Sequence, residues 1–181
     1  MAPRLGKTTP VAKGTIGEAV FSADAQYRYS LFRQWNQTDS PRLIMFICMN
    51  PSSANENEDD PTVVRVQRRA KALGYDGCYV MNLWAYRATD PPEMTAHYGG
   101  RLHVVDQPNV DAIRAAIPRC EAVVCAWGSD GGTLGNEMKK LLQEWGVKPK
   151  VLKLCKNGQP WHPLYLKYSL APIEWDMLTK S

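Results

Sequence analysis

Several motifs that would assign a function directly are missing from this 181-residue chain. None of its five cysteines forms a C-x-x-C pair, and its three histidines lack metal-ligand spacing, so we expect neither a zinc site nor a disulfide framework. No apolar run reaches the roughly 20 residues that span a bilayer, so we expect no contact with a membrane. A Walker motif and the sequence G-x-G-x-x-G are also absent, which argues against those nucleotide-binding loops and leaves no cofactor implied.

What remains is the composition of an ordinary globular protein. Hydrophobic residues make up 44% of the chain and charged residues 22%, as in a single domain with its own core. Thiols inside apolar runs favour a reducing, cytoplasmic location. The net charge of +4 permits nucleic-acid binding, and the six tryptophans and eight tyrosines serve either core packing or base stacking. Residues 1–26, which lack an apolar leader segment, are expected to be a flexible lead-in to one domain at 27–181.

The apolar run Leu43–Met49 organises the rest of the chain. It is apolar on both faces, which is typical of a strand buried in a parallel sheet. Ligands of open α/β sheets bind at the carboxyl ends of such strands. Asn50 and Ser52 follow this end at once, and an acidic loop ending in Asp59 and Asp60 comes shortly after. An ordinary Asn-Pro turn is the simpler alternative.

Periodicity predicts strands that alternate with helices. The expected strands are Tyr27–Trp35, Leu43–Met49, Gly77–Leu83, Ala122–Trp127 and Val151–Leu154, and the expected helices are Pro61–Leu73, Asn109–Ile117 and Thr133–Trp145. Asp60 is expected to cap the first helix, whose basic side chains should mostly face solvent. The alternation predicts a three-layer α/β/α sandwich with a central, mostly parallel sheet. The first two strands, joined by turn residues, are expected to be antiparallel neighbours, and Thr95–Gln107 an irregular connection.

Polar residues follow four of the predicted strands. Asn50 follows one strand, Asn82 with Arg87 and Asp90 a second, Ser129 a third and His162 a fourth. Because parallel strands end at the same edge of a sheet, these residues should converge there. Each also has a structural alternative: Asn82 as a turn former, the glycines around Ser129 as a helix-entry loop, and His162 as a side chain bonded to backbone.

The chain resembles an uncharacterised family of bacterial and phage proteins, a domain of unknown function. The resemblance rests on the motifs M-N-P-S-S-A, D-D-P-T, N-L-W-A-Y-R-A-T-D-P, A-W-G and H-P-L-Y, between about Tyr27 and Leu166.

A more distant resemblance is to the uracil-DNA glycosylase superfamily, whose motifs occur in the same order. Met49-Asn50-Pro51 is similar to the motif that positions the attacking water, and Val80–Leu83 to the strand whose asparagine reads the base. Val123–Ser129 is similar to the third motif. His162–Tyr165 is similar to the His-Pro-Ser-Pro loop that enters the minor groove, with Leu164-Tyr165 in place of Ser-Pro.

This resemblance implies a uracil-DNA-glycosylase-like fold and a monofunctional DNA glycosylase that acts as a monomer without a cofactor. Small residues after the water motif leave room for a substituent on the base. They favour a modified pyrimidine, hydroxymethylated or glucosylated, excised in defence against phages. The implied roles are catalysis for Asn50 (water), Asp60 (charge or base) and His162 (leaving oxygen); base binding for Met49, Ser52, Asn82 and Trp84; and DNA binding for Arg65, Arg87, Ser129, Lys156 and Tyr165.

Three alternatives remain open at this point. An enzyme on the same fold would act on free nucleotides or bases and bind duplex DNA weakly. A non-catalytic module would bind modified DNA without forming abasic sites. A hydrolase using Ser52 or Ser53 with His162 has the right residue types but lacks the G-x-S-x-G elbow.

Overall fold

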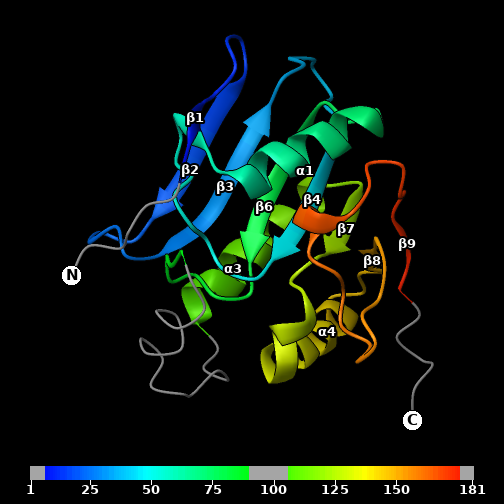
Figure 1. The fold of residues 1–181 in the computed structure, drawn as a ribbon. Helices are drawn as coiled ribbons and strands as arrows, with labels where there is room; N and C mark the ends of the chain where they lie inside the picture. Colours follow the sequence, from blue (N-terminus) through cyan, green and yellow to red (C-terminus); the bar gives the residue numbers. More distant parts are fainter. Residues whose placement is uncertain (1–6, 90–105, 176–181) are drawn as a thin grey trace.

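A seven-stranded mixed sheet forms the centre of the protein in a computed structural model that describes residues 7–89 and 106–175 (Figure 1). Its strands lie in the order β2-β3-β6-β4-β7-β8-β9, and β1 and β5 pair in a separate two-stranded sheet. The strands are β1 (Thr9–Pro10), β2 (Ile16–Phe21), β3 (Arg28–Gln34), β4 (Leu43–Cys48), β5 (Glu58–Asp59), β6 (Gly77–Asn82), β7 (Ala122–Cys125), β8 (Lys150–Val151) and β9 (Ile173–Glu174). The helices are α1 (Pro61–Ala72), α3 (Gln107–Ala116) and α4 (Gly132–Glu144), with 3-10 turns at Ile117–Arg119, Ser129–Gly131 and Pro163–Tyr165.

The sheet is mixed rather than mostly parallel. Strands β6, β4, β7 and β8 pair in parallel, whereas β2, β3 and β9 join the two sides of this block antiparallel. With the β1–β5 pair included, four of the seven strand pairings of the described residues are antiparallel. The expectation of an α/β protein is therefore confirmed, while the prediction of a mostly parallel sheet is wrong.

Strand β6 lies between the two strands that were expected to be neighbours. It pairs with β4 in parallel, and on its other side with β3, where Leu31 faces Val80. A tight hairpin between β3 and β4 would have placed these two strands side by side. Instead, the crossover through α1 returns the chain next to β4, and β6 takes the position between β4 and β3. The predicted pairing of Tyr27–Trp35 with Leu43–Met49 is therefore wrong.

The lead-in expected for residues 1–26 contains sheet structure. Strand β2 pairs with β3 over its whole length, and β1 pairs with β5 next to the acidic loop. Side chains of β2 alternate between exposed and half-buried, so the strand lacks the apolar run that marks a buried one. The predictions for Asp90 and for most of the Thr95–Gln107 connection lie outside the described residues.

Side chains of the central strands fill two hydrophobic cores, one on each face of the sheet. Alternate residues of β4 point to opposite faces and are almost completely buried, which confirms the prediction from its unbroken apolar run. Helix α1 contributes Val63, Val66 and Ala70 to one core, and α3 and α4 contribute Ile113 and Met138 to the other. No helix among the described residues combines the length and apolar character that crossing a membrane would need.

Helix α1 begins where the sequence predicts. The Asp60 carboxylate accepts a hydrogen bond from the Val63 backbone N–H at 2.9 Å, and Pro61 occupies the first turn. Gly74 follows the helix with φ +79°, a left-handed conformation that L side chains rarely adopt. The cap fixes Asp60, and hence the end of the acidic loop, close to the carboxyl edge of the sheet.

Candidate functional site

The chain segments that leave β4, β6 and β7 stay together beyond the ends of these strands. The Trp84 N–H donates to the Met49 carbonyl at 3.0 Å, and the Ala126 N–H donates to the Ile47 carbonyl at 2.8 Å. Farther along, the Ala88 N–H donates to the Pro51 carbonyl at 3.0 Å. The polar residues that follow β4 and β6 therefore share one edge of the sheet.

Asn50 is anchored through its amide nitrogen. The Nδ2 group donates to the Ala88 carbonyl at 2.8 Å and to its neighbour Pro51 at 3.1 Å. The side chain is half-buried, and its Oδ1 accepts no hydrogen bond from the described residues. Asn50 thus presents a hydrogen-bond acceptor of fixed direction, to which a donor such as a water molecule can bond.

Asn82 lies at the same edge, 2% exposed, and contacts a residue that sequence reasoning missed. The Nη2 of Arg28 donates to its Oδ1 at 3.2 Å, and the Nη1 donates to the Ala54 carbonyl at 3.0 Å. Burial lowers the pKa of the Arg28 guanidinium to about 10. The only sequence signal for this contact is an arginine inside an otherwise apolar and aromatic strand.

The Asp60 carboxylate lies among several groups of the edge. Burial has the largest effect on the pKa of three neighbouring groups, lowering it for Arg28 and His162 and raising it for Cys48. The negative charge of Asp60 raises the pKa of all three by a smaller amount. Asp60 is itself buried and uses Oδ1 to cap α1. The carboxylate therefore combines a structural role with an electrostatic one.

His162 is held as a neutral imidazole. Its Nδ1 accepts a hydrogen bond from the Leu164 backbone N–H at 3.4 Å, which places the proton on Nε2. Burial lowers the pKa of His162 to about 4, and the charge of Asp60 offsets only part of that effect. At neutral pH, His162 is a hydrogen-bond donor without charge.

The loop that carries His162 is attached to the end of β7. The Gly128 N–H donates to the Pro160 carbonyl at 2.8 Å, and a Cβ on Gly128 would lie 3.6 Å from that of His162. Gly128 has φ +92°, a conformation that favours glycine. The prediction that His162 directly follows a strand is wrong, because β8 ends at Val151. The loop that carries His162 reaches the edge through these contacts instead.

A second set of contacts fixes the loop to the start of α4. The Trp127 indole N–H donates to the Gln159 side-chain oxygen at 2.8 Å, and Asn157 donates to the Ser129 carbonyl at 3.0 Å. A Cβ on Gly131 would overlap the Trp127 ring, so only glycine allows this approach. Ser129 and Lys156, predicted to bind DNA, are both exposed at this end of the molecule.

The basic side chains of α1 are not all directed to solvent. Arg69 is fully buried and donates to backbone carbonyls between Leu166 and Leu170, which corrects the expected solvated face. Arg65 donates to the Leu166 carbonyl at 2.6 Å and stacks on Tyr168 at 4.1 Å. Both side chains thus hold the segment that follows His162, while Tyr165 projects from it with 77% exposure.

The predicted base-binding residues differ in their access to a ligand. Trp84 is 2% exposed and belongs to the core, so its ring is not an open stacking surface. Met49 and Ser52 are half-buried beside Asn50. Ser53 is buried, and its hydroxyl makes no hydrogen bond within the described part of the chain.

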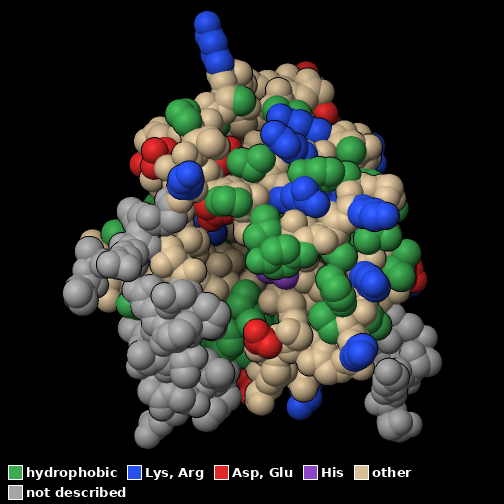
Figure 2. Space-filling model, in the orientation of Figure 1, with side chains coloured by type: hydrophobic (Ala, Val, Ile, Leu, Met, Phe, Trp, Pro, Cys, Tyr) green, Lys and Arg blue, Asp and Glu red, His purple; other side chains and the backbone are tan. Residues whose placement is uncertain are grey.

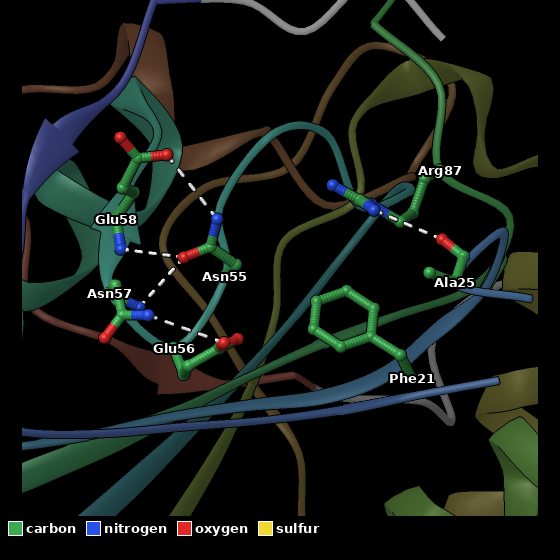
Figure 3. A pocket seen from close by; sticks show the side chains of 7 residues that line it. All are labelled: Phe21, Ala25, Asn55, Glu56, Asn57, Glu58 and Arg87. Atoms are coloured by element: carbon green, nitrogen blue, oxygen red, sulfur yellow. Dashed lines mark hydrogen bonds between the residues drawn. The ribbon is translucent and has the colours of Figure 1, made fainter. Parts of the chain in front are cut away.

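A pocket of about 520 Å³ lies beside this edge (Figure 3). The Arg87 guanidinium borders it, donates to the Ala25 carbonyl at 3.1 Å and to the Ser52 carbonyl at 3.3 Å, and stacks on Phe21. The acidic loop residues on the opposite wall bond mainly to one another, with the Asn55 oxygen accepting from two backbone N–H groups. Asn50, Asn82 and His162 do not line it.

The fold and the edge together define a mixed α/β protein with amide, carboxylate and neutral imidazole groups at the carboxyl end of its parallel strands. The model of a family described as "Protein of unknown function (DUF1643)" matches residues 28–164, so the chain belongs to that family. No curated protein and no solved structure matches the chain significantly.

Proposed function

We propose that the protein is a DNA glycosylase that hydrolyses the N-glycosidic bond of a modified pyrimidine in DNA and leaves an abasic site. The observation that carries the proposal is the neutral His162, with its proton on Nε2, at the edge that also carries Asn50 and Asn82. Excision of hydroxymethylated or glucosylated pyrimidines would serve defence against phages whose genomes contain them.

Hydrolysis of the N-glycosidic bond needs a positioned water, stabilisation of a sugar cation and donors for the departing base. A water oxygen forms a bond to C1′ of the sugar and gives up one proton to solvent, while the bond from C1′ to the base nitrogen breaks and its electrons leave with the base. The released base anion then takes up a proton from solvent. Asn50 Oδ1 would hold the water, and the Asp60 carboxylate would stabilise the sugar cation. The Nε2–H of His162 would donate to the base oxygen on which negative charge develops.

His162 suits this role because it is already neutral. A histidine with a pKa of about 4 holds no extra proton at neutral pH, so it stabilises the departing anion by hydrogen bonding rather than by protonating it. Asp60 is the weaker assignment, because one of its oxygens caps α1.

The fold supports the proposal in outline. Helix α1 packs on one face of the sheet and α3 and α4 on the other, which agrees with a three-layer arrangement of the uracil-DNA glycosylase type. We infer that the protein acts as a monomer on duplex DNA from which the target base is flipped out, at a cost of a few kcal/mol.

The surface supports a DNA partner. Lys and Arg side chains gather over and beside α1 on the face shown in Figure 2, and Arg68 and Lys71 of this helix are exposed. Tyr165 projects next to His162, where it could enter a groove. Arg65 and Arg87 are partly engaged by backbone carbonyls, and the Ser129 hydroxyl donates to Asp130 at 3.0 Å, so Lys156 is freer than these three predicted DNA contacts. Binding should weaken steeply as salt rises.

The decisive test is incubation of the protein with duplex DNA that contains ordinary, uracil, hydroxymethylated or glucosylated bases, followed by detection of abasic sites. We expect abasic sites in at least one modified DNA, and their loss in Asn50→Ala and His162→Ala with the fold retained. Activity only on free nucleotides would support a nucleotide-modifying enzyme instead. Tight binding of modified DNA that survives Asn50→Ala, without abasic sites, would identify a non-catalytic module.

A further inference from the structure

Arg28 is a buried cation without an ion-pair partner in the described part of the chain. It is 2% exposed, and no carboxylate of residues 7–89 and 106–175 lies within 4.0 Å of its guanidinium. Its two terminal nitrogens donate to the Ala54 carbonyl and to Asn82 Oδ1, at 3.0 and 3.2 Å, and its Nε has no partner there. Burying a charge without an ion-pair partner costs free energy, and packing alone would not require a cation here. The direct contact of Arg28 with Asn82 therefore suggests a role at the site.

The contact fixes which end of the Asn82 carboxamide faces Arg28. A guanidinium has only donors, so the atom that faces it must be the oxygen. The amide nitrogen then points away, and it donates to none of the described residues. The backbone beneath is also fixed, because Asn109 Nδ2 donates to the carbonyls of Asn82 at 2.8 Å and Leu83 at 3.1 Å.

We propose that Arg28 is a positioning residue that holds the Asn82 carboxamide with its N–H₂ group toward the site, so that the base atom read there is a hydrogen-bond acceptor. A carbonyl oxygen or an unprotonated ring nitrogen satisfies this donor. A ring N–H or an exocyclic amino group at the same place would face the Asn82 donor with a second donor. No hydrogen bond would form, so a base of that kind would bind less well. The inference rests on the proposed glycosylase activity and adds a rule for choosing the base.

Two pyrimidines that differ only in this edge test the rule. 5-Hydroxymethylcytosine carries an acceptor at ring position 3 and a donor at position 4, and 5-hydroxymethyluracil carries the reverse. Position 2 is a carbonyl acceptor in both pyrimidines, so the rule applies to positions 3 and 4, and at either of these a fixed donor discriminates between the two. We expect the wild-type rates of abasic-site formation to differ by about tenfold or more, the size of one unmatched hydrogen bond.

Variants separate positioning from stability. Arg28→Met frees the carboxamide to rotate and should reduce the ratio of the two rates to about threefold or less, whereas Arg28→Lys keeps a cation behind Oδ1 and should retain most of it. Asn82→Asp replaces the donor with an acceptor and should invert the preference. Arg69→Met is the matched control, because Arg69 is similarly buried but donates to backbone carbonyls from Leu166 to Leu170, and its ratio should stay at the wild-type value.

The outcomes distinguish this inference from the proposed function. A ratio near one in the wild type, or a wild-type ratio that Arg28→Met leaves unchanged, would overturn the positioning role while the glycosylase activity stands. Absence of abasic sites on every DNA tested would overturn the proposed function and this inference with it. Because the ratio compares two substrates of the same protein sample, partial unfolding of a variant does not change it.

Discussion

Acid should destabilise the folded protein in part through His162. Burial lowers the pKa of its imidazole from 6.5 to about 4, whereas the unfolded chain restores the ordinary value. Between these two pH values the unfolded state binds a proton that the folded state does not. The contribution of the neutral His162 to the free energy of unfolding is therefore fully present above about pH 6.5 and is lost as the pH drops toward 4. The full difference corresponds to about 3 kcal/mol, of which about 2 kcal/mol is lost by pH 5.

Urea unfolding of the wild type and of His162→Asn over this pH range measures the effect. The asparagine oxygen can still accept from the Leu164 N–H, so the turn is retained while the titrating group is removed. Between about pH 7.5 and pH 5, the wild type should lose about 2 kcal/mol more than the variant in the free energy of unfolding. Parallel curves for the two proteins would refute a buried, neutral His162.

Three further variants test other parts of the account. Arg33→Met breaks the buried Arg33–Asp59 ion pair, whose atoms lie 2.8 Å apart, and should lower the free energy of unfolding in urea by about 3–5 kcal/mol. Gly131→Ala forces a methyl group into the Trp127 ring and should destabilise the protein by about 1–3 kcal/mol, with a change in tryptophan fluorescence. Asp60→Asn should keep the helix cap, whereas Asp60→Ala should lose about 1 kcal/mol of stability. If both Asp60 variants lose abasic-site formation, the carboxylate acts in the reaction; an active Asp60→Asn would limit it to capping.

Short sequence patterns predicted the strand that ends, and the helix that begins, at the carboxyl edge of the sheet. The apolar run of β4 and the Asp60-Pro61 start of α1 are each encoded within a few residues, and both lie where the sequence indicates. The neighbour of β3 could not be predicted in this way, because strand pairing depends on contacts between distant segments. Periodicity placed Tyr27–Trp35 in a strand but could not show that β6, rather than β4, lies beside it.

The residues behind the site were harder to find. Alternation assigns Arg28 and Arg33 to opposite faces of a strand, and an arginine in such a pattern is ordinarily exposed. Both are buried because backbone carbonyls and an amide or carboxylate partner from later segments surround them. Trp84 illustrates the opposite error, since a tryptophan in a polar loop suggests stacking on a base, yet its ring belongs to the core.

Identification of a released base is the sharpest test of the proposed glycosylase activity. Modified phage-type DNA is incubated with the wild type, with Asn50→Ala or with His162→Ala, and the solution is analysed by mass spectrometry for free bases while the DNA is cleaved at abasic sites with alkali. We expect one free modified pyrimidine and matching strand breaks for the wild type, and neither product for the two variants. A wild type that releases no base, or variants that release it as fast as the wild type, would contradict this expectation.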